Sequence, residues 1–311
     1  MTLPTVSIII PTYNREDKIG NCLESVTNVD YPKNKIEIVV VDDGSIDQTK
    51  EIVTKFPVKF LRQKHKGPAM ARNNGIEHSR GKIIVFTDSD CVVPRGWLKG
   101  LVAGFADKKV AGVGGSINHI DNSFAVKYEQ YRRYLLYGDL KDNIFSNGFR
   151  YLPTCNLAIR RSIIDKVGLF DVTFGYAAAE DVDFCYRIFR AGGVVTYKPN
   201  VKIKHYHAQN WGKIAKRRFV QAKEILRFYE KRKLTKKLWL NYGISFVYLV
   251  VLPSLFISQL FFVSLLLMTL VPHIKNLRKV RKKINYLPFV LVDYFMYYVD
   301  SFAKFLHFLR F

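Results

Sequence analysis

The most constraining feature of this chain is a repeated alternation of short apolar runs with helical segments. The runs at residues 6–10, 36–41 and 83–86 are separated by stretches in which apolar residues recur at helical spacing. Strands buried on both faces read as nearly continuous apolar runs, and parallel strands need long, usually helical, connections. The pattern therefore predicts an α/β fold with a largely parallel sheet.

Polar residues follow these runs where each strand should end. They are Pro-Thr-Tyr-Asn at 11–14, Asp-Asp-Gly-Ser at 42–45 and Asp-Ser-Asp at 88–90. Open α/β sheets bind ligands at the carboxyl ends of their strands, so these residues predict a nucleotide-binding crevice. Asp88 and Asp90 suit Mg²⁺ or Mn²⁺, which takes one or two carboxylates and completes its shell with water and substrate phosphates. The alternative for an isolated Asp-x-Asp is a solvated acidic loop.

Further elements are expected up to residue 207. The segment 122–138 is a helix rich in aromatic residues, which would form core, line an acceptor groove or touch a bilayer. A helix should begin at 179–183 and end near 191, where two glycines follow. The other expected elements are a helix at 97–105 and strands at 110–115, 152–159, 194–197 and 201–207.

Charge is concentrated in the last third of the chain. The net charge is +23, and residues 213–311 carry 19 Lys and Arg against 4 Asp and Glu. A nucleic-acid binder has such a surplus, but the basic clusters here flank apolar runs and no nucleic-acid motif is visible. An anionic membrane surface is therefore the expected partner, and nucleic acid is not.

The carboxy-terminal apolar segments predict membrane attachment. Residues 213–237 read as a basic amphipathic connecting helix, and 238–274 is a run of 37 residues without Asp, Glu, Lys or Arg. About 20 apolar residues cross a bilayer. We expect a hairpin of two short helices, with one span kinked at Pro253 as the alternative, and 287–311 as a further spanning or interfacial segment. The predicted domains are thus 1–212 (catalytic), 213–237 (connecting) and 238–311 (membrane-associated or transmembrane).

Cysteine usage and the amino terminus indicate the compartment. The four cysteines show no metal-binding or disulfide spacing, which fits a reducing cytoplasm. No signal peptide is expected, because residues 1–5 lack a basic region and the first apolar run is short. We expect a protein at the cell membrane with its catalytic domain facing the cytoplasm.

Five motifs, in this order, resemble those of family 2 glycosyltransferases with the GT-A fold. The resemblance covers roughly residues 5–207 and implies a mixed, largely parallel GT-A sheet. It also implies an inverting transferase that uses a nucleotide-diphosphate sugar, with a UDP-sugar favoured. The motifs are Ser-Ile-Ile-Ile-Pro-Thr-Tyr-Asn at 7–14, Val-Asp-Asp-Gly-Ser-x-Asp at 41–47, Gly-Pro-Ala-x-x-Arg-Asn at 67–73, Asp-x-Asp at 88–90 and Glu-Asp-x-Asp at 180–183.

The resemblance implies roles for individual residues. Asp181 would be the general base, and Glu180 would bind the acceptor or orient the base. Asp90 would ligate the cation, and His205, with His207 as the alternative, would complete the metal site. The nucleotide-sugar-binding residues would be Pro11, Thr12, Tyr13, Asn14, Asp42, Arg72 and Asp88.

Each of these residues also has a purely structural interpretation. Asp42 and Asp43 would simply form the turn before Gly44. Arg72 would be an exposed helix charge, and the histidines would be ordinary surface residues. The acidic residues at 180–183 would favour the first turn of a helix, with Asp183 the strongest candidate for a cap.

The absence of one motif bears on the product. The Gln-x-x-Arg-Trp element of processive synthases is missing, and Lys-Arg-Arg-Phe stands near its place at 216–219. The chain is therefore expected to transfer a single sugar to an acceptor hydroxyl. Because the apolar segments would hold the site near a membrane, we expect this acceptor to be a lipid-linked glycan used in cell-surface polysaccharide or glycoconjugate assembly. The alternatives are a polyprenyl-phosphate glycosyltransferase and a non-catalytic scaffold that binds nucleotide sugars.

Overall fold

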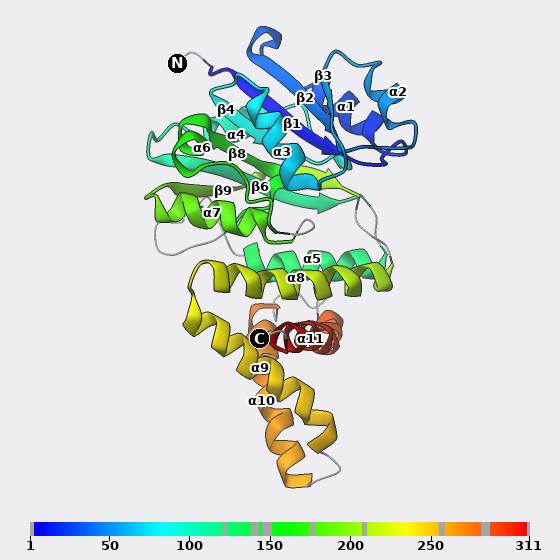
Figure 1. Ribbon diagram of the computed structural model, residues 1–311, viewed down its shortest axis with the longest axis vertical. Helices are drawn as coiled ribbons and strands as arrows, with labels where there is room; N and C mark the ends of the chain where they lie inside the picture. Colours follow the sequence, from blue (N-terminus) through cyan, green and yellow to red (C-terminus); the bar gives the residue numbers. More distant parts are fainter. Residues whose placement is uncertain are drawn as a thin grey trace. The chain divides into compact units, whose positions relative to one another are not determined.

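The computed structural model (Figure 1) describes residues 3–120, 123–137, 143–144, 151–174, 178–206, 210–254, 259–280 and 287–309. The chain divides into two compact units. The sheet unit comprises residues 1–120 and 140–206, and the helical unit comprises 121–139 and 207–311.

The sheet unit is built on one mixed sheet. Strands β1, β2, β3 and β4 pair in parallel, as the strand–helix alternation predicted. Strand β8 runs antiparallel to β4 and β6, and β9 is parallel to β6 but antiparallel to β5 and β7. The order is β3-β2-β1-β4-β8-β6-β9-β5, with β7 also paired to β9. The strands are β1 (Val6–Thr12), β2 (Ile36–Asp42), β3 (Lys59–Arg62), β4 (Ile83–Phe86), β5 (Cys91–Val92), β6 (Val110–His119), β7 (Asn143–Ile144), β8 (Leu157–Arg160) and β9 (Val194–His205).

Helices cover both faces of this sheet, which explains why β1 and β4 are buried along their whole length. Ile8 belongs to the main core cluster with residues of α1 and α4. The neighbouring Ile9 faces α3, where a Cβ on Gly75 would lie 2.5 Å from the Ile9 Cγ2 atom, so glycine permits the close approach of α3. The helices of this unit are α1 (Ile19–Thr27), α2 (Thr49–Val53), α3 (Pro68–Glu77), α4 (Trp97–Ala103), α6 (Arg161–Val167) and α7 (Glu180–Arg190), with 3₁₀ turns at Lys33–Lys35 and Thr154–Asn156.

The helical unit packs around a buried polar cluster. The Arg218 guanidinium forms ion pairs with Asp293, at 2.9 Å, and with Asp300, and it donates a hydrogen bond to the Tyr128 hydroxyl. Tyr128 and Tyr131 are fully buried, so these two aromatic residues of the 122–138 segment form core, one of the three alternatives considered for it. The helices are α5 (Phe124–Tyr137), α8 (Trp211–Lys231), α9 (Thr235–Ser254), α10 (Gln259–Val280) and α11 (Leu287–Phe308).

The expectation of transmembrane helices within 238–311 is not met. Among the described residues, no helix combines the length and apolarity needed to cross a bilayer. The helices mix apolar with charged residues. The first turn of α9 contains Lys236 and Lys237, the last turns of α10 contain Lys275 and Arg278, and α11 contains Asp293 and Asp300. The apolar run forms parts of α9 and α10, which pack against each other.

Candidate active site

The loop after β2 is held by two buried aspartates with different partners. Asp42 Oδ1 accepts a hydrogen bond from the Ser45 N–H at 3.0 Å, and Asp42 Oδ2 lies 3.3 Å from Arg62 Nε. The Asp43 carboxylate accepts from the N–H groups of Lys66 (2.9 Å) and Gly67 (2.8 Å). Asp43 therefore ties this loop to the chain that enters α3, while Asp42 Oδ2 has no protein hydrogen bond among the described residues.

Gly44 allows this loop to turn. Its φ is +88°, a conformation that side-chain-bearing residues adopt with strain. A Cβ at this position would lie 3.1 Å from the His65 backbone nitrogen. The turn chemistry considered for Asp42 and Asp43 is thus present, and in Asp42 it uses Oδ1, while Oδ2 faces Arg62.

The loop after β1 lies against the loop after β2. Asn14 adopts φ 49°, and it accepts a hydrogen bond from the Ile46 N–H at 3.0 Å while its own N–H donates to Ser45 Oγ at 2.9 Å. The Tyr13 ring stacks on His65 with centroids 4.1 Å apart, and Tyr13 is partly exposed. The Tyr13 ring therefore joins the loop after β1 to the segment that follows β3.

Two threonine hydroxyls at the strand ends have no hydrogen-bond partner in the described part of the chain. Thr12, which follows Pro11 in β1, and Thr87, which follows β4, are both buried. Neither Oγ1 atom has a hydrogen-bond partner among the described residues. An unpaired buried hydroxyl is costly, so these groups are suited to contact a bound polar molecule.

Arg72 joins two parts of the predicted site. Its buried guanidinium donates from Nη1 to Glu180 Oε1 at 3.0 Å and from Nη2 to Asp88 Oδ1 at 3.1 Å. Burial alone would lower the pKa of Arg72, but the charges of Asp88 and Glu180 raise it. The alternative of an exposed helix charge is excluded by this burial, and the guanidinium stays charged and fixed between two carboxylates.

The first turn of α7 holds Glu180 and Asp181 in different environments. Glu180 is buried, and its Oε2 accepts a hydrogen bond from the Ala178 N–H at 2.9 Å. Asp181 is partly exposed, and no basic side chain among the described residues forms an ion pair with it. Surrounding protein atoms nevertheless desolvate the carboxyl group. This desolvation, followed by the charge of Glu180, raises the pKa of Asp181 to about 7. Asp183 pairs instead with Arg187 at 2.8 Å.

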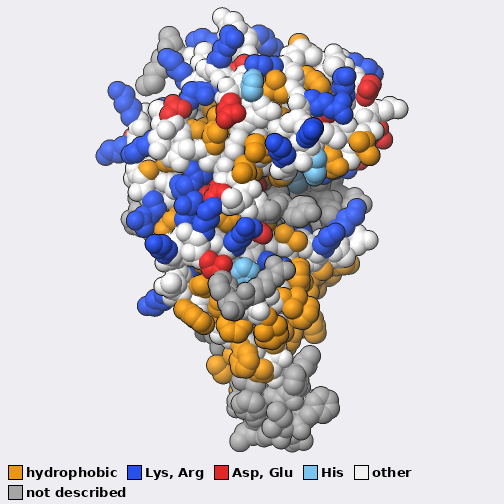
Figure 2. Space-filling view, viewed as in Figure 1, with side chains coloured by type: hydrophobic (Ala, Val, Ile, Leu, Met, Phe, Trp, Pro, Cys, Tyr) orange, Lys and Arg blue, Asp and Glu red, His pale blue; other side chains and the backbone are white. Residues whose placement is uncertain are grey.

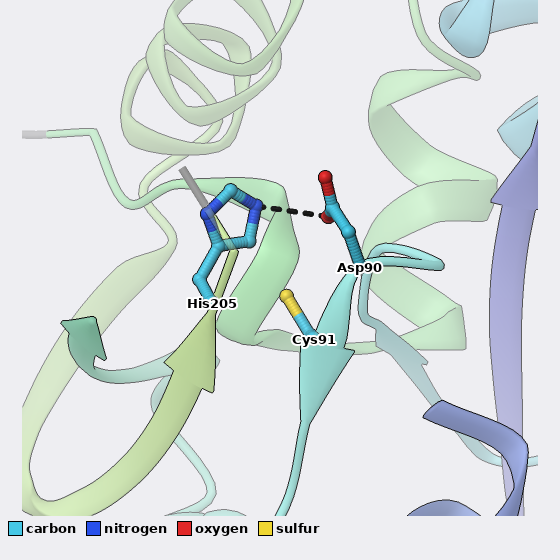
Figure 3. Close-up of side chains that lie close together, drawn as sticks. All are labelled: Asp90, Cys91 and His205. Carbon is cyan, nitrogen blue, oxygen red and sulfur yellow. Dashed lines mark ion pairs between the residues drawn. The ribbon is translucent and has the colours of Figure 1, made fainter. Parts of the chain in front are cut away.

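Asp90 and His205 come together at the pairing of β5 with β9. His205 Nε2 lies 3.0 Å from Asp90 Oδ1 (Figure 3). Burial would raise the pKa of Asp90, but the hydrogen bond and charge of His205 lower it; conversely, Asp90 raises the pKa of His205 against the effect of burial. One ligand atom each from Asp90, Cys91 and His205 lies within 4.8 Å of the others. His207 lies outside the described residues.

Sequence reasoning missed Arg62, His65 and Cys91. Arg62 ends β3, so the rule used for the other strand ends could have identified it. Cys91 directly follows Asp90, and its proximity to His205 was hidden because the two residues lie 114 positions apart along the chain. The pairing of Tyr13 with His65 likewise depends on tertiary structure.

Comparison with known proteins decides the family. The profile described as Glycosyl transferase family 2 matches residues 7–168, slightly more than half of the chain. This chain belongs to glycosyl transferase family 2. The matched segment contains the loops after β1, β2 and β4, and the resemblance inferred from the motifs is thereby confirmed.

Two relatives extend the similarity of this family 2 glycosyltransferase. It is 32% identical over 254 residues to glycosyltransferase AglE of Haloferax volcanii, covering 78% of this chain and 82% of that protein. It is 28% identical over 219 residues to dolichyl N-acetyl-alpha-D-glucosaminyl phosphate 3-beta-D-2,3-diacetamido-2,3-dideoxy-beta-D-glucuronosyltransferase of Methanococcus voltae, covering 65% of this chain and 66% of that protein.

A solved structure supports the fold assignment. The glycosyltransferase is similar to mannosyltransferase PcManGT from Pyrobaculum calidifontis, solved in complex with GDP-Man and Mn²⁺. The TM-score is 0.68 at 20% identity, covering 98% of this chain and 87% of that one. The predicted GT-A fold, with its mixed sheet and flanking helices, is therefore confirmed.

Proposed function

We propose that this chain is an inverting, metal-dependent glycosyltransferase that moves one sugar from a nucleotide-diphosphate sugar to a hydroxyl of a lipid-linked glycan. Asp181 is the general base: it takes the proton from the acceptor hydroxyl as that oxygen attacks the anomeric carbon. The nucleotide diphosphate leaves from the opposite face. One displacement inverts the anomeric configuration and needs no covalent nucleophile.

The observation that carries this proposal is the contrast between the two carboxylates that begin α7. Glu180 is buried and engaged by Arg72, whereas Asp181 lacks a cationic partner among the described residues. A general base works best when its pKa lies near the operating pH, and the pKa of Asp181 is raised to about 7. This contrast supports the assignment of Glu180 as a positioning carboxylate and of Asp181 as the proton acceptor.

The donor nucleotide is recognised at the ends of β1 and β2 in this proposal. Asp42 Oδ2 is assigned to accept a hydrogen bond from a ring N–H of the base: it lies 3.3 Å from Arg62 Nε but accepts no hydrogen bond from the described residues. The partly exposed Tyr13 offers an aromatic face. Uracil and guanine both present a ring N–H that could donate to Asp42. UDP-sugars remain our favoured donors, and GDP-sugars are the alternative, because PcManGT was solved with GDP-Man. The hydroxyls of Thr12 and Thr87 are further contacts.

Asp90 and His205 are the proposed ligands of Mg²⁺ or Mn²⁺. The donor set fits such a cation because one carboxylate and one imidazole converge, leaving other positions for water and phosphate oxygens. A divalent cation bound there would neutralise charge on the leaving diphosphate. Asp88 is held by Arg72 and is assigned to the donor ribose or to the water shell of the cation.

The acceptor is a sugar hydroxyl in this proposal and not a polyprenyl phosphate. A phosphate is already ionised at neutral pH, so a base of raised pKa would have little to do, whereas a hydroxyl needs one. The name of the Methanococcus voltae relative describes transfer to a dolichyl-linked sugar, in agreement with this choice.

We also propose that the helical unit binds the cytoplasmic face of an anionic membrane. Figure 2 shows hydrophobic side chains gathered on the surface of this unit. Trp239 on α9 and Leu291 on α11 are each 63% exposed, and Phe246 and Phe295 continue these stripes one or two turns further along the same helices. Lys236 and Lys237 add positive charge beside Trp239. Apolar and basic side chains together favour an anionic lipid surface.

The proposal is tested by incubating the protein with labelled nucleotide sugars and a membrane lipid extract. Mn²⁺, Mg²⁺ or a chelator is added, and label is followed into the organic phase. Label that enters lipid from one donor, and only with metal, supports the full proposal. If donor is consumed but the label remains in the aqueous phase, the lipid acceptor is contradicted and the rest of the proposal stands. If no donor is consumed under any condition, the non-catalytic scaffold becomes the better interpretation.

A further inference from the structure

The thiol of Cys91 has no role in the proposed reaction, yet it lies at the metal site. Cys91 and His205 are direct partners in the antiparallel pairing of β5 with β9, so their side chains project from the same face. Figure 3 shows the Cys91 sulfur beside the Asp90–His205 ion pair. The three potential ligand atoms lie within 4.8 Å of one another.

The backbone fixes the positions of these three residues. The Cys91 N–H donates to the Asp88 carbonyl at 3.0 Å, which closes a turn through Ser89 and Asp90. The Tyr206 N–H donates to the Asp90 carbonyl, also at 3.0 Å. Because these bonds hold both strands, Asp90, Cys91 and His205 do not have to be gathered from separate, independently moving segments.

The combination of carboxylate, thiolate and imidazole favours a particular class of cation. Zn²⁺ and other thiophilic ions prefer sulfur and nitrogen ligands, whereas Mg²⁺ and Mn²⁺ prefer oxygen. Asp88, the other carboxylate of the Asp-x-Asp motif, is engaged by Arg72. The remaining set of one oxygen, one sulfur and one nitrogen donor is therefore poorer in oxygen than a dedicated Mg²⁺ site.

We propose that Asp90, Cys91 and His205 form a binding site for a thiophilic divalent cation such as Zn²⁺, and that Zn²⁺ bound there excludes the cation required for sugar transfer. On binding, the thiol proton passes to solvent and the sulfur coordinates the ion as a thiolate. The binding site is inferred from the geometry alone; the competition rests on the proposed function.

The test is a titration of the full-length protein with Cd²⁺, without donor, followed by sulfur-to-cadmium charge-transfer absorption in the ultraviolet. We expect this absorption to saturate at about one ion per chain and to be lost in Cys91→Ser. The matched control is Cys185→Ser, which removes another fully buried thiol and should keep the absorption. Absence of the absorption in the wild type, or its persistence in a folded Cys91→Ser, overturns the site.

A second variant covers the case in which Cys91→Ser does not fold. His205→Gln keeps the thiol but removes the imidazole ligand, so it should weaken Cd²⁺ binding by more than the loss of about 10- to 100-fold that follows removal of a residue supporting a ligand. Unchanged affinity in this variant contradicts the site. Inhibition of transfer by Zn²⁺ that excess Mn²⁺ relieves supports the competition. Saturable Cd²⁺ absorption without any transfer activity supports the site while contradicting the proposed function.

Discussion

Arg72 and Glu180, 108 residues apart in the sequence, form an ion pair with 3.0 Å between Nη1 and Oε1. Both side chains are 3% exposed. The same guanidinium contacts Asp88 at 3.1 Å, so one buried cation links the end of β4 to the first turn of α7. Arg72 therefore holds both the proposed donor-binding carboxylate, Asp88, and Glu180, the residue that precedes the proposed base Asp181.

Replacing Arg72 should lower the free energy of unfolding of the sheet unit. Arg72→Met leaves the buried Glu180 carboxylate without its partner, and breaking a buried pair costs about 3–5 kcal/mol. Urea denaturation should show a loss of that size, while the control Arg95→Met, at an exposed position, should change stability little. Equal stability of the two variants would contradict the structural role of Arg72.

Activity should depend on the protonation of Asp181. A carboxylate accepts a proton only when ionised, so kcat/KM should rise with pH through about 7 and level off above it. Glu180→Gln removes a negative charge that raises the pKa of Asp181, so the rising limb should move to lower pH. If kcat/KM rises over the same pH range in the wild type and in Glu180→Gln, the rise reports the titration of a group other than Asp181.

The loop after β2 should not tolerate a side chain at Gly44. Gly44→Ala places a β-carbon on a residue with φ +88° and 3.1 Å from the His65 backbone nitrogen. The left-handed conformation alone costs about 1–2 kcal/mol. We expect lower thermal stability and weaker binding of UDP or GDP by calorimetry. Gly96→Ala, where nothing lies within 4 Å of the new atom and φ is −81°, is the control that should behave as the wild type.

Much of the fold followed from local patterns. Continuous apolar runs predicted β1, β2 and β4. The order of strands in the sheet did not follow, because β8 inserts between β4 and β6 from later in the chain. Two predicted strands, 194–197 and 201–207, form the single β9, since no turn separates them.

The site was predictable where residues adjoin strand ends and hidden where distant segments meet. Asp42 and Asp90 could be named from the motifs, but the burial of Arg72 between Asp88 and Glu180 could not. Charge and apolarity in the last third predicted spanning segments, and the described helices do not meet this expectation. The sequence pattern does not show which polar residues face the interior of the helical unit. Asp293 and Asp300 point to the buried Arg218, inside the helical unit.

Membrane binding should depend on the exposed apolar residues of the helical unit. Burying one such side chain in lipid is worth about 1.5–3 kcal/mol, so Trp239→Ser or Leu291→Ser should weaken binding about tenfold or more. The measurement is flotation with vesicles of phosphatidylglycerol and phosphatidylcholine. Ile46→Ser, which removes an even more exposed apolar side chain from the sheet unit, should bind as the wild type. Loss of binding in Ile46→Ser alone would assign the membrane contact to the sheet unit.

Transfer by an Asp181→Asn variant tests the central claim most directly. The asparagine oxygen can still accept the 2.8 Å hydrogen bond from the Val182 N–H, so the fold and donor binding should be retained. The account predicts that transfer of labelled sugar falls about 10²- to 10⁴-fold, while nucleotide binding and the activity of an exposed control, Asp165→Asn, stay unchanged. Full transfer by a folded Asp181→Asn protein would contradict the assignment of Asp181 as the base and, with it, the proposed mechanism.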